Sequence, residues 1–392
     1  MINKWNDLFL SNYSTPDIEL VQGEGVYVKD SKGNIYLDFL AGIAVNTLGH
    51  AHPKVIEAVN HQIKTLSHTS NLYANNVIIR LAEEIISIAG FKGKLFFCNS
   101  GTEALEAAMK LSRLMNKTNV VALDGSFHGR TFGSLSITGQ IKKQKPFTPL
   151  VKKVKFIEPN NQRALKRSIK TKTAAFFLEP IQGEGGVIDI EKDFVLSARN
   201  FTRAKKCLFV IDEVQTGIGR TGNWFAFQNL EVVPDVLCMA KGLAGGLPIG
   251  AILVHEDYQD LFQPGHHGST FGGNPIVASA ALAVIKTIRE QKLLENVINM
   301  GTKLREQILH ISDVENVTGS GLLLGIKLKN ISAKLIEKEC QKLGMLVNAV
   351  SENVIRIAPP LIISEEHVNR AVEILDDAIN IVKRFGENIE IR

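Results

Sequence analysis

Hydrophobic positions follow two different patterns along the chain. Between about residues 94 and 254, short apolar runs, several of them fully apolar, alternate with amphipathic segments. The apolar runs stand at 94–98, 119–123, 153–157, 174–179, 208–212, 235–239 and 249–254. Apolar runs without alternation are typical of strands covered on both faces, and their alternation with helical segments predicts a largely parallel sheet. This region therefore predicts an α/β fold.

The flanking regions predict smaller elements. A hairpin is expected within 24–39, and helices are expected at about 53–66 and 77–89, with long helical patterns over 275–311. Beyond residue 320, short strands alternate with helices: strands near 322–328, 345–348 and 354–357, and helices near 331–343 and 364–385. We therefore expect an N-terminal segment with a β-hairpin at 1–50, a large α/β domain at 51–275, and a small C-terminal α+β domain at 276–392 that includes the long connecting helix.

Two buried strands end in opposite charges. The run 236–240 stops at Lys241, and the run 208–211 stops at Asp212. Burial lowers the pKa of a lysine and frees neutral amine to attack an aldehyde, whereas a buried aspartate needs a cation beside it. This combination is typical of a pyridoxal phosphate site, in which the lysine forms the Schiff base and the aspartate faces the pyridinium nitrogen. A structural Lys–Asp ion pair is the alternative that either residue alone would favour.

The loops after other strands carry matching groups. Gly101 and Thr102 open a helix whose unpaired N–H groups suit a phosphate, and Phe127 can stack on a planar ring. Arg130 offers a fork for a carboxylate, and Glu184 lies in a glycine-rich loop. Further hydroxyls stand in the loop of Ser269 and Thr270. Each segment alone fits an ordinary cap or core, but together, at the carboxyl ends of strands, they predict a ligand site.

Composition excludes several other classes of protein. The chain has 392 residues with a formal net charge of +5, and the basic pairs Lys142-Lys143, Lys152-Lys153 and Lys205-Lys206 are interpreted as solvated surface, not as a nucleic-acid site. Neither a signal peptide in residues 1–14 nor a long apolar span is evident, so we expect a cytoplasmic protein without a membrane span. The four separated cysteines predict reduced thiols. The histidines at 50, 52, 266 and 267 form no convincing ligand set, so no metal is expected.

With these residues in view, the chain resembles the class III aminotransferases, which are pyridoxal phosphate enzymes of fold type I. The resemblance rests on LFVIDEVQTGIGRTGNWFAFQ at 208–228 and PDVLCMAKGLAGGLPIGA at 234–251, and it extends from GEGVYVKDSKG to IRIAPPL. Within the class, the chain is most similar to acetylornithine aminotransferases. The segments that carry this similarity are GIAVNTLGHAHPKV, HTSNLY, FFCNSGTEALEAAMKLSR, SFHGRTFGSLS and DEVQTGIGRTG.

The resemblance implies roles at the cofactor. Lys241 would form the Schiff base and transfer the substrate proton, and Asp212 would pair with the pyridinium. Phe127 would stack on the ring, while Gly101 and Thr102 would bind the phosphate. Gln215 would lie near the ring hydroxyl, with Glu213 and Val214 beside it. Thr270 would reach the phosphate of a partner subunit's cofactor, which implies a homodimer.

The resemblance also implies how two substrates are held. Arg130 with Ser269 would bind the acylated amino acid, and Arg356 would bind the α-carboxylate of 2-oxoglutarate or glutamate. Glu184 would pair with Arg356 when the other substrate is present, and Tyr13 would add a contact to the α-carboxylate. N-acetylornithine and 2-oxoglutarate would then yield N-acetylglutamate 5-semialdehyde and glutamate in arginine biosynthesis. We expect a side activity on N-succinyldiaminopimelate.

Several alternatives stay open on the sequence. Ornithine, succinylornithine and 4-aminobutyrate aminotransferases share the chemistry and differ in few contacts. A mutase or decarboxylase would keep Lys241 and Asp212, and a non-catalytic protein would keep only the fold. The joint presence of Arg130, Glu184 and Arg356 favours transamination between two substrates.

Overall fold

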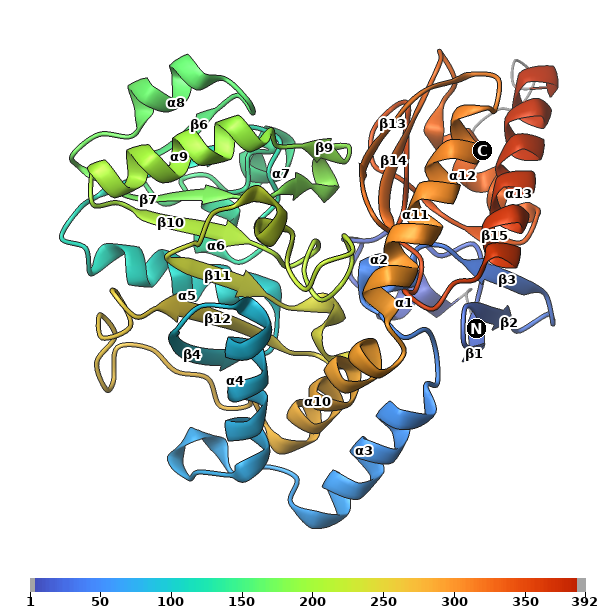
Figure 1. Ribbon diagram of the computed structural model, residues 1–392. Helices are drawn as coiled ribbons and strands as arrows, with labels where there is room; N and C mark the ends of the chain where they lie inside the picture. Colours follow the sequence, from blue (N-terminus) through green and yellow to red (C-terminus); the bar gives the residue numbers. More distant parts are fainter. Residues whose placement is uncertain (1–3, 386–392) are drawn as a thin grey trace.

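The computed structural model describes residues 4–385, which form two lobes (Figure 1). One lobe holds a seven-stranded sheet, and the other holds the C-terminal strands and helices, coloured orange to red, with the blue N-terminal strands beside them. The division at residues 50 and 275 stays a prediction. The predicted N-terminal segment includes residues 1–3 and the predicted C-terminal domain includes residues 386–392, and these lie outside the described residues.

The large sheet is mostly parallel, as the apolar runs predicted. Its spatial order is β4 (Gly93–Cys98), β12 (Gly250–His255), β11 (Val236–Met239), β10 (Leu208–Asp212), β7 (Thr173–Leu178), β5 (Asn119–Leu123) and β6 (Val154–Ile157). Strand β12 alone is antiparallel to its neighbours, so β4 and β11 on either side of it run in the same direction. The strand bounds agree with the predicted runs to within one residue.

Both faces of this sheet are buried, which explains why its strands are apolar throughout. Alternate residues of each strand pack into different cores: Phe209 and Ile211 into one, Leu208 and Val210 into the other. Helix α5 (Gly101–Arg113) covers the face of Val210. The opposite face is covered by α4 (Asn76–Ala89), α8 (Gln162–Ser168), α9 (Lys192–Ala204) and α10 (Pro275–Glu290).

The second lobe combines the two ends of the chain. Strands β1 (Leu20–Glu24), β2 (Tyr27–Asp30) and β3 (Ile35–Asp38) form an antiparallel ribbon, and β15 (Met345–Leu346) joins it parallel to β3. A second sheet has the order β13 (Val314–Ser320), β14 (Leu323–Leu328), β17 (Val354–Ile357) and β16 (Asn348–Ala349). It is accompanied by α11 (Leu293–Leu309), α12 (Ala333–Lys342) and α13 (Glu365–Phe385).

The remaining elements are short or peripheral. They are α1 (Trp5–Leu8), α2 (Ala41–Ala44), α3 (Pro53–Thr65), α6 (Phe132–Ser136), α7 (Ile141–Gln144) and the two-stranded sheet of β8 (Ile181–Gln182) and β9 (Ile188–Asp189). Helix α3 packs on α10. No helix within residues 4–385 is both long and apolar enough to cross a membrane. All four cysteines are buried and outside any disulfide.

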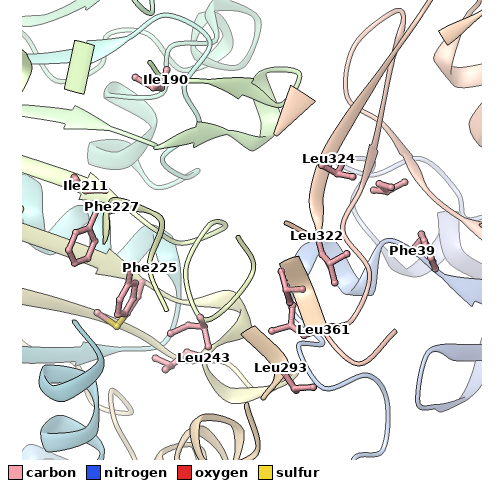
Figure 2. Packing of buried hydrophobic residues seen from close by; sticks show 14 of the residues in the cluster. Phe39, Ile190, Ile211, Phe225, Phe227, Leu243, Leu293, Leu322, Leu324 and Leu361 are labelled. Atoms are coloured by element: carbon pink, nitrogen blue, oxygen red, sulfur yellow. The ribbon is translucent and has the colours of Figure 1, made fainter. Parts of the chain in front are cut away.

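One hydrophobic core joins the lobes. Figure 2 shows Ile211 and Leu243 of the large lobe in the same cluster as Leu361, Leu322 and Leu324, which lead toward the C-terminal sheet. Leu243, Leu322 and Leu361 are fully buried. Because burial of such side chains stabilises by about 1.5–3 kcal/mol each, this shared core holds the lobes in a fixed relation across the carboxyl edge of the large sheet.

Two features differ from the predicted elements. The helical pattern over 275–311 is interrupted between α10 and α11, where Lys292 adopts a left-handed φ of +51°. The segment 345–348 is divided between two sheets, since β15 pairs with β3 while β16 pairs with β17. This division ties the N-terminal ribbon to the C-terminal lobe.

Candidate active site

The carboxyl ends of five strands meet at one cavity. Strands β4, β5, β7, β10 and β11 share a direction, so the residues that follow them lie at one edge of the sheet. The cavity there has a volume of about 420 Å³. Eight of the predicted site residues line it: Gly101, Thr102, Phe127, Arg130, Asp212, Val214, Gln215 and Lys241. The structure thus brings together most of the predicted cofactor site.

Lys241 is presented by a strained turn after β11. Its φ of +37° is in the left-handed region, which costs a non-glycine residue about 1–3 kcal/mol and is found mainly at functional sites. The Thr47 hydroxyl donates to the carbonyl of Gly242 at 2.8 Å, and a Cβ on Gly242 would lie only 2.5 Å from that hydroxyl. Burial lowers the pKa of Lys241 to about 8, against opposing contributions from Glu184, Asp212 and Glu179. A sizeable fraction of neutral amine is therefore present near neutral pH.

Asp212 is a buried carboxylate held by two donors. Its Oδ2 lies 2.7 Å from Nδ1 of His128, and its Oδ1 accepts from the Val214 amide at 2.9 Å. Both side chains are almost fully buried. The pair fixes the direction of the carboxylate at the cavity wall, where a cationic ring nitrogen would complete its partners. His128 has this contact although the sequence analysis gave it no role.

The start of α5 forms an anion site on the cavity wall. Ser100 caps the helix, and the Glu103 carboxylate accepts the Asn99 amide at 2.6 Å. The Gly101 and Thr102 amides stand in the first turn, where the helix offers no carbonyl partner. The Thr102 hydroxyl is turned to Thr131 and Ser134, at 2.9 and 2.6 Å. The backbone, more than the Thr102 hydroxyl, is therefore available to a phosphate.

Phe127 forms an aromatic wall with cations beside it. Its amide donates to Oε2 of Glu179 at 2.8 Å, which fixes the loop. The Arg130 guanidinium lies 5.6 Å from the Phe127 ring centroid, and the Lys143 ammonium lies 5.1 Å from it. Lys142 is exposed, as expected of a solvated pair, but Lys143 is half-buried. The interpretation of Lys143 as solvated surface is therefore wrong.

Glu179 is a site residue that the sequence analysis missed. It follows β7 directly, lines the cavity and is almost fully buried. Burial, followed by the charge of Asp212, raises the pKa of Glu179 well above its usual range, which favours the protonated acid. The signal that could have found it is the one that identified Asp212, an acidic residue at the end of a wholly apolar strand.

Arg356 and Glu184 form an ion pair between the lobes. Arg356 comes from β17 and its side chain is 1% exposed, while Glu184 follows β8 and its side chain is 25% exposed. The guanidinium also donates to Gln215 Oε1 at 3.1 Å and to Asn348 Oδ1 at 2.8 Å. Burial opposes ionisation of Glu184, but the charge and hydrogen bond of Arg356, with smaller contributions from Lys241 and Lys143, lower its pKa.

Besides Arg356 and Glu184, which adjoin the cavity through Gln215, four predicted residues lie away from its lining. The Glu213 carboxylate accepts from the Phe227 amide at 2.8 Å and from the Thr216 hydroxyl, and burial raises its pKa to about 7. The Ser269 hydroxyl accepts from the Asn99 side chain at 3.1 Å and from the Gly272 amide at 3.0 Å. Thr270 is exposed, and Tyr13 is 75% exposed. Within one chain, the structure does not gather these residues around Lys241.

The residues around the cavity fit pyridoxal phosphate. A lysine of lowered pKa suits its aldehyde, a fixed buried carboxylate suits its ring nitrogen, an aromatic side chain suits its ring, and a helix start suits its phosphate. Lys241, Asp212, Phe127 and the Gly101–Thr102 amides would hold these four parts.

Comparison with known proteins agrees with this geometry. A family model described as "Aminotransferase class-III" matches residues 10–379. The acetylornithine aminotransferase of Mycolicibacterium smegmatis is 49% identical over 375 residues, which cover 95% of this chain and 96% of that protein. The solved acetylornithine aminotransferase of Elizabethkingia anophelis is 32% identical with a TM-score of 0.84, covering 96% of this chain and 97% of that one.

A second solved structure bears on the cofactor. The ornithine aminotransferase of Toxoplasma gondii is 29% identical with a TM-score of 0.92, covering 97% of this chain and 94% of that one. Its description reports partial occupancy of pyridoxal phosphate at the active site.

The lowered pKa of Lys241 predicts how cofactor capture depends on pH. Only the neutral amine attacks an aldehyde, so the rate at which cofactor-free protein captures pyridoxal phosphate should rise with pH and level off above a midpoint near 8. Stopped-flow absorbance at constant ionic strength measures this rate. A midpoint above 10, typical of an exposed lysine, would contradict the burial of the amine.

Proposed function

This chain belongs to the class III aminotransferases, and we propose that it transfers the terminal amine of N-acetylornithine to 2-oxoglutarate. The products would be N-acetylglutamate 5-semialdehyde and glutamate. The proposal is carried by one observation: the buried Lys241 lies close to the Glu184–Arg356 ion pair, whose charges act on it. We interpret this ion pair as the switch between the two substrates. The 49% identity to an acetylornithine aminotransferase over nearly the whole chain supports N-acetylornithine as the amine donor.

The protein is a pyridoxal phosphate-dependent transaminase. When bound, the cofactor supplies a ring that accepts the electrons of a broken carbon–hydrogen bond. Asp212, fixed by His128 and the Val214 amide, would hold the protonated ring nitrogen. The Lys241 amine would move the substrate proton, and its pKa of about 8 suits a group that must both accept and return a proton near neutral pH.

Two arginines would hold the carboxylates of the two substrates. Arg130 is exposed and its guanidinium lies near the Phe127 ring, where it would bind the acylated donor. The contacts of Ser269 to the donor and of Tyr13 to the α-carboxylate stay predictions, because neither residue lines the cavity. Arg356 is covered by Glu184 while a donor amine occupies the centre. An α-carboxylate of 2-oxoglutarate would displace Glu184 and take the guanidinium, whose buried Nε has no hydrogen-bond partner within residues 4–385.

A dimer would complete the site. Thr270 is exposed and does not line the cavity of its own chain, and exposed apolar side chains stand in its own segment and in a neighbouring one: Phe271 is 61% exposed, Leu72 82% and Tyr73 73%. Asn71 donates to the Gly272 carbonyl at 3.3 Å, which joins these two segments into one surface. We propose that a second copy of the chain covers this surface and that Thr270 contacts the cofactor phosphate of that second copy.

Activity on N-succinyldiaminopimelate and a cytoplasmic location stay predictions.

The donor preference follows from charge. Free ornithine carries an α-ammonium that would lie near the Arg130 guanidinium, whereas acetylation removes that charge. We expect kcat/KM for N-acetylornithine to exceed that for ornithine and for 4-aminobutyrate by at least about tenfold, a difference of ~1.4 kcal/mol. Steady-state assays with 2-oxoglutarate measure the ratio. A higher kcat/KM for ornithine would be consistent with transamination but would contradict N-acetylornithine as the preferred amine donor.

Removal of Arg356 should separate the two half-reactions. Arg356→Ala should slow the 2-oxoglutarate half-reaction by about 100-fold or more, because only that substrate needs the uncovered guanidinium, and should slow the N-acetylornithine half-reaction far less. Single-turnover absorbance follows each half separately. Arg370→Ala, an exposed arginine of the same lobe, is the matched control. Equal losses in both halves would reject the switch.

A hybrid dimer tests the proposed contribution of Thr270. Thr270→Glu should repel a phosphate, and Lys241→Ala removes the amine. If Thr270 acts across the interface, a purified hybrid of these two variants contains one intact site and should show roughly half of wild-type activity, although each parent dimer is inactive. An inactive hybrid would place Thr270 in its own subunit's site. The hybrid is isolated by two affinity tags and compared with a wild-type dimer that carries the same tags.

A further inference from the structure

The proposed switch leaves a carboxylate without its partner. When the acceptor's α-carboxylate takes Arg356, Glu184 loses the cation that holds it in place. Glu184 is only 25% exposed, so water alone would solvate it incompletely. Unless another cation is near, this loss would oppose binding of the acceptor. A cation that stays available to Glu184 in that state would remove this cost.

Three cations act on the charge of Glu184: Arg356, then Lys241, then Lys143. In the acceptor half-reaction Arg356 is claimed by the substrate, and Lys241 is committed to the reacting carbon. Lys143 is the one of the three that stays available. Arg130 is exposed, so solvent screens its charge.

Lys143 is already connected to Glu184 through one side chain. Its ammonium donates to Gln140 Oε1 rather than to a carboxylate. The Gln140 Nε2 donates in turn to the backbone carbonyl of Glu184 at 3.3 Å and to that of Gly125 at 3.1 Å. Gln140 thus joins the short helix α7, whose Lys143 lies near the Phe127 ring, to the loop that carries Glu184.

The electrostatics favour a closer approach. Burial lowers the pKa of Lys143, and among the charged groups that act on it, Glu184 is the strongest and raises it. The other strong contributions, from Arg130 and Arg356, are repulsive. A partly desolvated ammonium between two guanidinium groups gains from a carboxylate, and Glu184 is the carboxylate that acts on it most strongly.

We propose that Lys143 receives the Glu184 carboxylate when Arg356 turns to the acceptor, and so acts as a positioning residue for the acceptor half-reaction. The inference rests on the proposed function, since it needs an acceptor that claims Arg356. Lys143 stabilises the open state of the switch, in which Arg356 is exposed to a dicarboxylate. It is not required in the closed state, in which Glu184 covers Arg356.

Lys143→Met tests this role, because methionine keeps an apolar stem over Phe127 and removes the charge. At subsaturating 2-oxoglutarate, the acceptor half-reaction should slow by about 10- to 100-fold, and the N-acetylornithine half-reaction should slow by less than about threefold. Lys143→Arg, which restores the charge, should recover most of the loss. Lys142→Met, an exposed lysine in the same helix, is the matched control.

A double-mutant cycle separates this role from direct substrate binding. In a Glu184→Gln background no carboxylate has to be received, so Lys143→Met should then cost less than about threefold. If Lys143 instead bound the distal carboxylate of the substrate, Lys143→Met would slow the acceptor half-reaction as much in that background as in the wild type, which would overturn the proposal.

Calorimetry on the holoenzyme gives a readout without turnover. Lys143→Met should weaken glutarate binding about tenfold and leave binding of N-acetylnorvaline, which has one carboxylate, within about twofold.

The outcomes also separate this inference from the proposed function. A wild-type protein that does not react with 2-oxoglutarate would reject the proposed function itself. A wild-type protein that reacts, together with a Lys143→Met variant whose two half-reactions slow equally, would reject only the role of Lys143.

Discussion

The buried Arg356 is paired with a single carboxylate, that of Glu184, and the arrangement of this site depends on that ion pair. Arg356 is the largest fully buried side chain in the described part of the chain. Withdrawal of its partner without replacement would leave a desolvated charge, which costs several kcal/mol. The cation can therefore exchange one carboxylate for another but cannot remain bare. Such an exchange lets one cavity accept a terminal amine and then an α-keto acid.

The fold supplies the two halves of that exchange from different lobes. Arg356 comes from β17 of the C-terminal sheet, whereas Glu184 and Lys143 come from loops and a short helix above the large sheet. The shared core through Leu243, Leu322 and Leu361 sets the distance between the lobes (Figure 2). The reacting lysine is held by the end of β11 in the large lobe and by the contact of Thr47, from the N-terminal segment, to the Gly242 carbonyl.

The sequence predicted the large sheet well for a physical reason. Strands that are buried on both faces are apolar, so the ends of each apolar run indicate the ends of the strand. A charged residue at such an end indicates a candidate ligand site, and Asp212 and Lys241 were found in this way. Glu179 shows the same signal and could have been found. Strand β13 could not be predicted from the sequence, because an irregularity in its pairing between Val314 and Asn316 breaks the two-residue alternation of buried and exposed positions.

Other features depend on contacts that no local pattern encodes. The pair Lys142-Lys143 is a charge run in a four-residue helix, and only its packing against Phe127 distinguishes the buried lysine from the exposed one. The adjacent carboxylates of Asp212 and Glu213 point to different surroundings because successive side chains at a strand end diverge. The division of 345–348 between two sheets requires a partner strand more than three hundred residues away in the chain.

The most direct test of the account is an absorbance spectrum of the purified protein with pyridoxal phosphate, compared with that of Lys241→Ala. The account predicts a visible band in the wild type that bleaches on addition of N-acetylornithine and returns with 2-oxoglutarate. It predicts no such cycle in the variant. A variant that bleaches and recovers at a rate within tenfold of the wild type would contradict the central claim, that the amine at the end of β11 performs the chemistry.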